Sequence, residues 1–107
     1  MKNIFVAISF ILPATSVFAA THDVEAASYR EHLTFICYMF GTSVTLEDWD
    51  QATTAHENVA QYARADGASV KYMQAMRHAG IARAEAVMEE WVDRSEARLT
   101  CNDVHGG

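Results

Sequence analysis

The sequence predicts an all-α protein: a small bundle of three or four helices, closed by one disulfide, that follows a cleaved signal peptide. Three observations predict this fold. After residue 19 the chain has no proline and only three interior glycines, which favours long helices. Apolar residues recur at spacings of three and four. Two cysteines, Cys37 and Cys101, lie in a chain that is expected to be exported into an oxidising compartment.

The signal peptide is predicted over residues 1–19. Its opening sequence has a basic start at Lys2, a nine-residue apolar run that Pro13 ends, and small residues before the mature chain. The run is too short to span a bilayer, which takes about 20 apolar residues, so no stable membrane anchor is expected. Cleavage after Ala19 satisfies the small-residue rule and leaves residues 20–107 as a single helical domain, periplasmic or secreted.

The first helix is expected over residues 22–40. Thr21 is in position to cap it, acidic residues occupy its first turns, and Gly41 can end it. Its last turns read FICYMF, a sequence with high β propensity that also suits a strand. The only other β-prone segment, residues 42–45, is too short and too close to build a sheet, so a helix is favoured.

The second helix is expected over residues 46–66, because Thr45 and Asp48 have nearly the spacing of a capping box and Gly67 follows the last turn. The third is expected over residues 70–99, capped by Ser69. Gly80 lies inside it, and either a break or a continuous helix at this glycine fits the sequence. The last six residues, 102–107, are expected to form a loose tail.

A bundle running up, down and up brings Cys37 and Cys101 to the same end, as a disulfide requires. Helix lengths agree less well: a straight third helix would carry Cys101 past Cys37 by about 20 Å. A bend at Gly80 or a chain that folds back would remove this excess. Otherwise the bridge joins two chains in a homodimer. A redox or nucleophilic role is disfavoured because no CxxC pair is present.

The segment before Gly41 is predicted to be core in the folded monomer, covered by the two tryptophans of the later helices. The residues assigned to this core, which would become an interface if the bundle opened, are Phe35, Ile36, Met39, Phe40, Trp49 and Trp91.

The net charge limits the class of partner. Without Lys2, the mature chain has 7 basic and 14 acidic residues, a net charge of −7. Nucleic acid and anionic lipid would be repelled, whereas a basic protein surface would be attracted. No catalytic signature is present, so an enzyme is not expected. The favoured function is protein binding, in the manner of an immunity or inhibitor protein that acts as a folded monomer.

Two other functions stay open. An acid-stress periplasmic chaperone would unfold partly and bind many clients, since protonation of the carboxylates and histidines would take the mature side chains from −7 to about +12. A periplasmic copper or nickel binder would use the new N-terminus, where Ala20, Thr21 and His22 resemble the amino-terminal Cu/Ni motif of four planar nitrogens. His56, on the apolar face of the second helix, is expected to be a hydrogen-bonded core residue.

Overall fold

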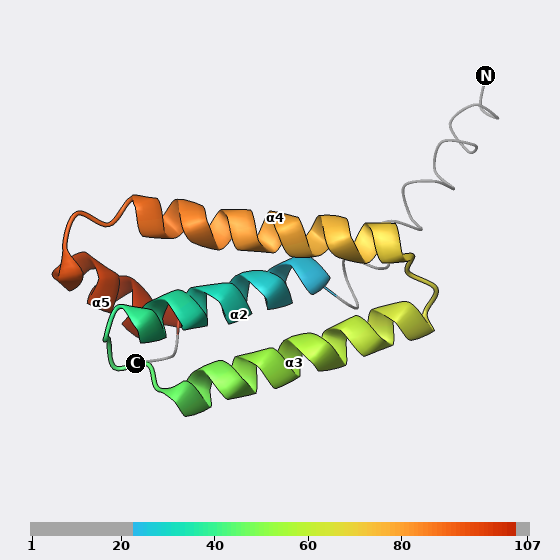
Figure 1. Cartoon of the computed structure of the whole chain (residues 1–107), viewed down its shortest axis with the longest axis horizontal. Coiled ribbons are helices and arrows are strands. Elements are labelled where there is room, and N and C mark those ends of the chain that lie inside the picture. Colours follow the sequence, from blue (N-terminus) through green and yellow to red (C-terminus); the bar gives the residue numbers. More distant parts are fainter. Residues whose placement is uncertain (1–22, 105–107) are drawn as a thin grey trace, which may run out of the picture.

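The computed structural model describes residues 23–104, which form four helices and no strand (Figure 1). The helices are α2 (Val24–Met39), α3 (Leu46–Ala65), α4 (Val70–Glu89) and α5 (Arg94–Val104). The predicted all-α fold is therefore confirmed. The predicted signal peptide, the candidate metal-binding residues 20–22 and the last three residues lie outside the described residues.

Side-chain caps and glycines set the boundaries of the first two helices. Asp23, not Thr21, caps α2 by accepting a hydrogen bond from the Ala26 amide at 2.9 Å. After α2 ends, Gly41 adopts a left-handed φ of 69°, a conformation that glycine adopts without strain. Thr45 and Asp48 then form the predicted capping box at the start of α3.

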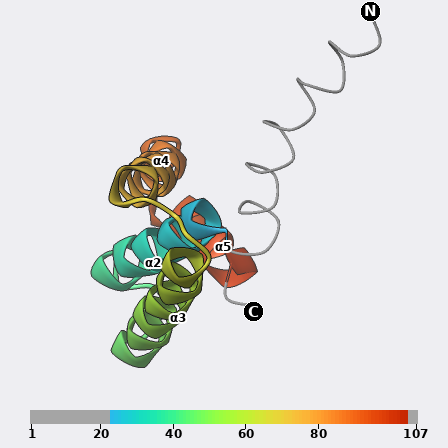
Figure 2. The ribbon, with the colours of Figure 1, turned by 90° about the vertical axis from the view of Figure 1, so that its right-hand side faces the viewer.

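Helix α2 is the centre of the domain. Helix α3 runs antiparallel to α2 and helix α4 runs parallel to it, and the two pack on α2 from different sides with little contact between them. Figure 2, which looks along the bundle, shows α4 and α3 flanking α2, with α5 beside it. The domain therefore depends on α2, because its buried residues pack against the three other helices.

Gly80 does not break the third helix, because α4 continues through it to Glu89. The glycine instead lies where α4 and α2 approach each other closely. A Cβ atom built at Gly80 would lie 2.5 Å from the Glu25 carbonyl oxygen and 2.8 Å from both the Ser28 Cβ and the Tyr29 amide nitrogen. The absence of a side chain here lets the two backbones meet.

The third predicted helix is in fact two helices, α4 and α5, separated by residues 90–93. The Asp93 side chain accepts a hydrogen bond from the Glu96 amide at 3.1 Å, and the Glu96 carboxylate accepts one from the Val92 amide. These two hydrogen bonds lie at the start of α5, where the chain turns back toward α2. Residues 102–104, expected in a loose tail, are the last turn of α5.

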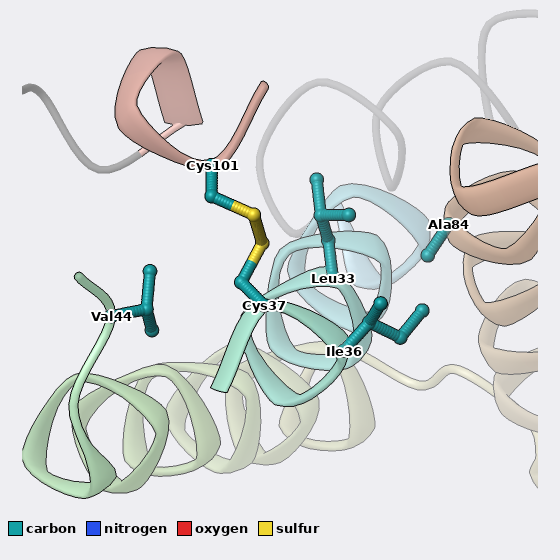
Figure 3. Packing of buried hydrophobic residues seen from close by; sticks show 6 residues of the cluster. All are labelled: Leu33, Ile36, Cys37, Val44, Ala84 and Cys101. Carbon is teal, nitrogen blue, oxygen red and sulfur yellow. A yellow bond between two sulfur atoms is a disulfide. The ribbon is translucent and has the colours of Figure 1, made fainter. Parts of the chain in front are cut away.

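The returning helix closes the disulfide within one chain. Cys37 and Cys101 are bonded with their Cα atoms 5.9 Å apart and 64 positions apart in sequence. The fold-back removes the excess length predicted for a straight helix. Figure 3 shows the bridge between α2 and α5, beside Leu33 of α2 and Val44 of the loop before α3. These residues, with Ile36 and Ala84, are the buried core of this end.

Candidate functional site

The segment before Gly41 is only partly core. Ile36 is buried, and the Phe35 ring packs on Trp49 with centroids 4.8 Å apart. Phe40 meets Trp91 edge to face at 5.2 Å but is 37% exposed. Met39 is 63% exposed, contrary to the expectation that it is covered. Helix α5 packs on the side of α2 that carries Leu33 and Cys37, which leaves the last turn of α2 partly uncovered.

Exposed apolar side chains gather at the disulfide-linked end of the bundle. At this end α2 and α4 finish and α3 and α5 begin (Figure 1). Of the eight large hydrophobic residues that are exposed in the described chain, six belong to this end. They are Tyr38, Met39, Phe40, Leu46, Val92 and Leu99. The other two, Tyr62 and Val70, lie at the opposite end.

The same end concentrates the negative charge of the protein. We define the acidic end as residues 38–50 together with residues 87–104. It contains eight carboxylates and two arginines, a net charge of −6. The other described residues contain six carboxylates and five Lys or Arg residues, a net charge of −1. The protein is therefore strongly polarised, with nearly all of its excess charge beside its exposed apolar side chains.

A second polar feature lies between α2 and α3. The His56 Nδ1 atom is 3.0 Å from a Glu31 carboxylate oxygen, and its Nε2 atom is 3.0 Å from the Ser28 hydroxyl. This confirms the predicted hydrogen-bonded His56. The order serine, histidine, acid matches that of hydrolytic triads. Ser28, however, is 1% exposed under Gly80, so no substrate carbonyl can reach its hydroxyl in this conformation.

A shallow groove separates α3 from α4, because these helices contact α2 but hardly each other. Two cavities of about 200 and 190 Å³ lie along it, and Arg77 lines both. The first is lined by residues of α2, α3 and α4, among them His32, Trp49 and Ile81. The groove carries charges of both signs, including Glu31 and Arg64, and therefore selects no partner by charge.

Residues 23–104 contain no group of three or more His, Cys, Asp or Glu side chains placed to hold a metal ion. None of the described helices is both long and apolar enough to cross a membrane.

The chain matches no family model, and comparisons with curated proteins and with solved structures also give no match. The candidate site is therefore defined by its own geometry and charge.

Sequence reasoning found the two tryptophans and the apolar segment but missed their surroundings. It treated the 14 carboxylates as one uniform charge, whereas most of the excess collects at one end. The signal was present in the sequence: residues 47–50 and 89–96 are rich in acids and flank the two tryptophans. The up, down and up course of α2, α3 and α4 brings the two segments to one end, and the fold-back at residues 90–93 keeps α5 there.

Proposed function

We propose that this chain is a small exported protein that binds another protein in its folded state through the acidic end, in the manner of an immunity or inhibitor protein. The observation that carries the proposal is the coincidence of six exposed large apolar side chains with a net charge of −6. Exposed apolar side chains rimmed by polar groups are typical of interaction surfaces. Tyrosine, tryptophan, phenylalanine and methionine are the residue types enriched there.

The surface is available without unfolding. Met39, Leu46 and Leu99 are each more than half exposed while the disulfide and the core beneath them are intact. A chaperone that acts after acid opening would need no such surface in the closed state. A binder that acts at neutral pH requires one, and the disulfide fixes its backbone in advance.

The charge selects the class of partner. A second copy of the chain would bring −6 against −6 if it docked through the same end, so self-association there is disfavoured. A basic protein surface would be attracted, and long-range attraction would raise its rate of association at low salt. The partner class supported here is thus a basic protein with an apolar contact face.

Affinity capture with matched variants tests the proposal. The mature protein, immobilised at pH 7, would be exposed to a periplasmic extract, and captured proteins would be identified and then titrated in purified form. We expect one partner at 1:1 stoichiometry. Leu46→Gln and Leu99→Gln should each weaken it by roughly tenfold or more, as expected for an interface anchor.

Tyr62→Gln and Val70→Gln provide the control, since both residues are large, apolar and exposed but lie at the opposite end. These variants should bind as the wild type does. The proposal is wrong if the two control variants lose the partner while the acidic-end variants keep it, or if capture occurs only after acid unfolding and includes many unrelated clients.

A further inference from the structure

Both tryptophans of the chain line cavities at the acidic end, and each does so beside two carboxylates. The larger cavity, about 530 Å³, lies on the first two turns of α3. It is lined by Leu46, Glu47, Trp49, Asp50 and Thr53. One ring, one aliphatic side chain, one hydroxyl and two acids thus face a single space.

The smaller cavity, about 280 Å³, lies between the end of α4 and α5. It is lined by Val87, Glu90, Trp91, Glu96, Leu99 and Thr100. Its chemistry repeats that of the first cavity, with a tryptophan, two carboxylates, a leucine and a threonine, although the residues come from different helices. Two independent segments have therefore produced the same combination at one end of the molecule.

Both indole rings are held in place by the fold. Trp49 packs on Phe35 and stacks with Tyr38, at centroid distances of 4.8 and 6.1 Å. Trp91 contacts the Phe40 ring, and its Nε1 atom donates a hydrogen bond to the Thr100 hydroxyl at 3.0 Å. Because the rings are already fixed, binding of a ligand would cost little side-chain entropy.

A tryptophan ring beside carboxylates suits a long organic cation. The ring face attracts the charge, the carboxylates pair with it, and the aliphatic side chain packs on its methylene stem. Arginine fits better than lysine, because its planar guanidinium can stack on indole and donate two parallel hydrogen bonds to one carboxylate. Neither of the protein's own arginines at this end, Arg94 and Arg98, lines either cavity.

We propose that the basic partner inserts an arginine side chain into each of these two cavities. The inference rests on the proposed function and deepens it by naming the partner chemistry: two arginines presented on one protein surface. Nucleic acid brings negative charge and has no such groups, and a second copy that docked through its own acidic end would oppose −6 to −6.

Nuclear magnetic resonance of the mature protein labelled with ¹⁵N tests the inference without the natural partner. The probe is N-acetyl-arginine amide, and its neutral isostere, N-acetyl-citrulline amide, is the control ligand. The indole N–H signals of Trp49 and Trp91, assigned with Trp91→Phe, report on the two cavities separately. We expect saturable shifts of both signals with the arginine probe in low salt, lost at high salt, and no comparable shifts with citrulline.

Charge-neutral variants assign each effect to its cavity. Asp50→Asn should weaken the Trp49 response by roughly two- to fivefold and leave the Trp91 response unchanged, as expected for loss of an exposed ion pair. Glu90→Gln should do the reverse. Glu89→Gln is the matched control, because Glu89 is exposed beside Glu90 but lines neither cavity.

Equal shifts with citrulline and arginine, or arginine shifts that the Asp50 and Glu90 variants do not alter, would overturn the inference. Because the probe is a free amino-acid derivative, this result is separate from the capture experiment. A partner that binds the acidic end while the arginine probe fails would retain the proposed function and remove only the arginine anchors.

Discussion

The contact between α4 and α2 at Gly80 gives the sharpest test of the fold. A glycine in the middle of a helix usually costs about 1 kcal/mol relative to alanine, so Gly→Ala in a helix normally stabilises a protein. At Gly80 we expect the opposite sign. The new Cβ would lie 2.5 Å from the Glu25 carbonyl oxygen, 0.9 Å closer than the 3.4 Å at which ordinary contact begins.

The expected loss of stability in Gly80→Ala depends on which atoms must move to make room for the new Cβ. Two of the three nearest atoms belong to the α2 backbone, and the third is the Cβ of the buried Ser28, so no flexible side chain can give way. Helix α4 must shift away from α2 along the main helix contact of the domain. Overpacking of this kind costs about 3 kcal/mol at the upper end of its usual range. After the gain of about 1 kcal/mol in helix propensity, the net loss should be roughly 2 kcal/mol.

Urea unfolding at 25 °C, followed by circular dichroism, would measure the difference. The free energy of unfolding should fall by roughly 2 kcal/mol in Gly80→Ala, and the melting temperature by about 10 °C. Ala82→Gly, at an exposed position of the same helix, is the control and should lose only about 1 kcal/mol from propensity. If Gly80→Ala instead stabilises the protein, the close approach of α4 to α2 does not exist.

Four further predictions concern the disulfide, His56, acid and copper. Cys101→Ser should lower the free energy of unfolding by about 4 kcal/mol, because it releases a 64-residue loop to Cys37; a disulfide-linked dimer in non-reducing mass spectrometry would contradict the intrachain bridge. His56→Ala should cost about 1–3 kcal/mol, since it leaves two polar partners unsatisfied, while exposed His78→Ala should change stability by less than about 0.5 kcal/mol. Client-aggregation assays at pH 7 and pH 2 should show no protection at either pH; protection at pH 2 alone would support the chaperone alternative. Titration of the mature protein with Cu(II) should show one site that His22→Ala removes, and N-terminal sequencing that starts at any residue other than Ala20 would eliminate this site.

Helix boundaries that have an explicit local signal could be predicted from the sequence. Thr45 with Asp48 and Ser69 mark the starts of α3 and α4, and Gly41 and Gly67 follow the ends of α2 and α3. Helix-length arithmetic was also sound: a straight third helix could not carry Cys101 to Cys37, and the chain does fold back.

The position of that fold-back could not be read from glycine or proline. The chain turns at residues 90–93, which contain neither. In this turn Trp91 packs against Phe40 and donates a hydrogen bond to the Thr100 hydroxyl, contacts that a local sequence pattern does not show. The spacing of Asp93 and Glu96 was the one local signal, since it resembles a capping box. Gly80 looked like a break because sequence alone cannot distinguish a helix stop from a close helix contact.

The candidate site was harder to predict from the sequence than the helices or the disulfide. Large apolar side chains before Gly41 were assigned to the core by composition, yet a small domain cannot cover all of its apolar residues. The side of α2 that the returning helix α5 covers depends on tertiary packing and not on the local sequence. Met39 was left exposed by that choice, while Ile36, three residues earlier, was buried.

Photo-crosslinking at defined positions tests the central claim, that the acidic end of the folded protein is its docking surface, most directly. A photoreactive phenylalanine analogue would replace Leu46 or Leu99 at the acidic end, or Tyr62 or Val70 at the other end. Irradiation at pH 7, in the presence of the captured partner, should give crosslinks from Leu46 and Leu99 that fall as salt is raised. Crosslinks from Tyr62 and Val70, with none from the acidic end, would contradict the account.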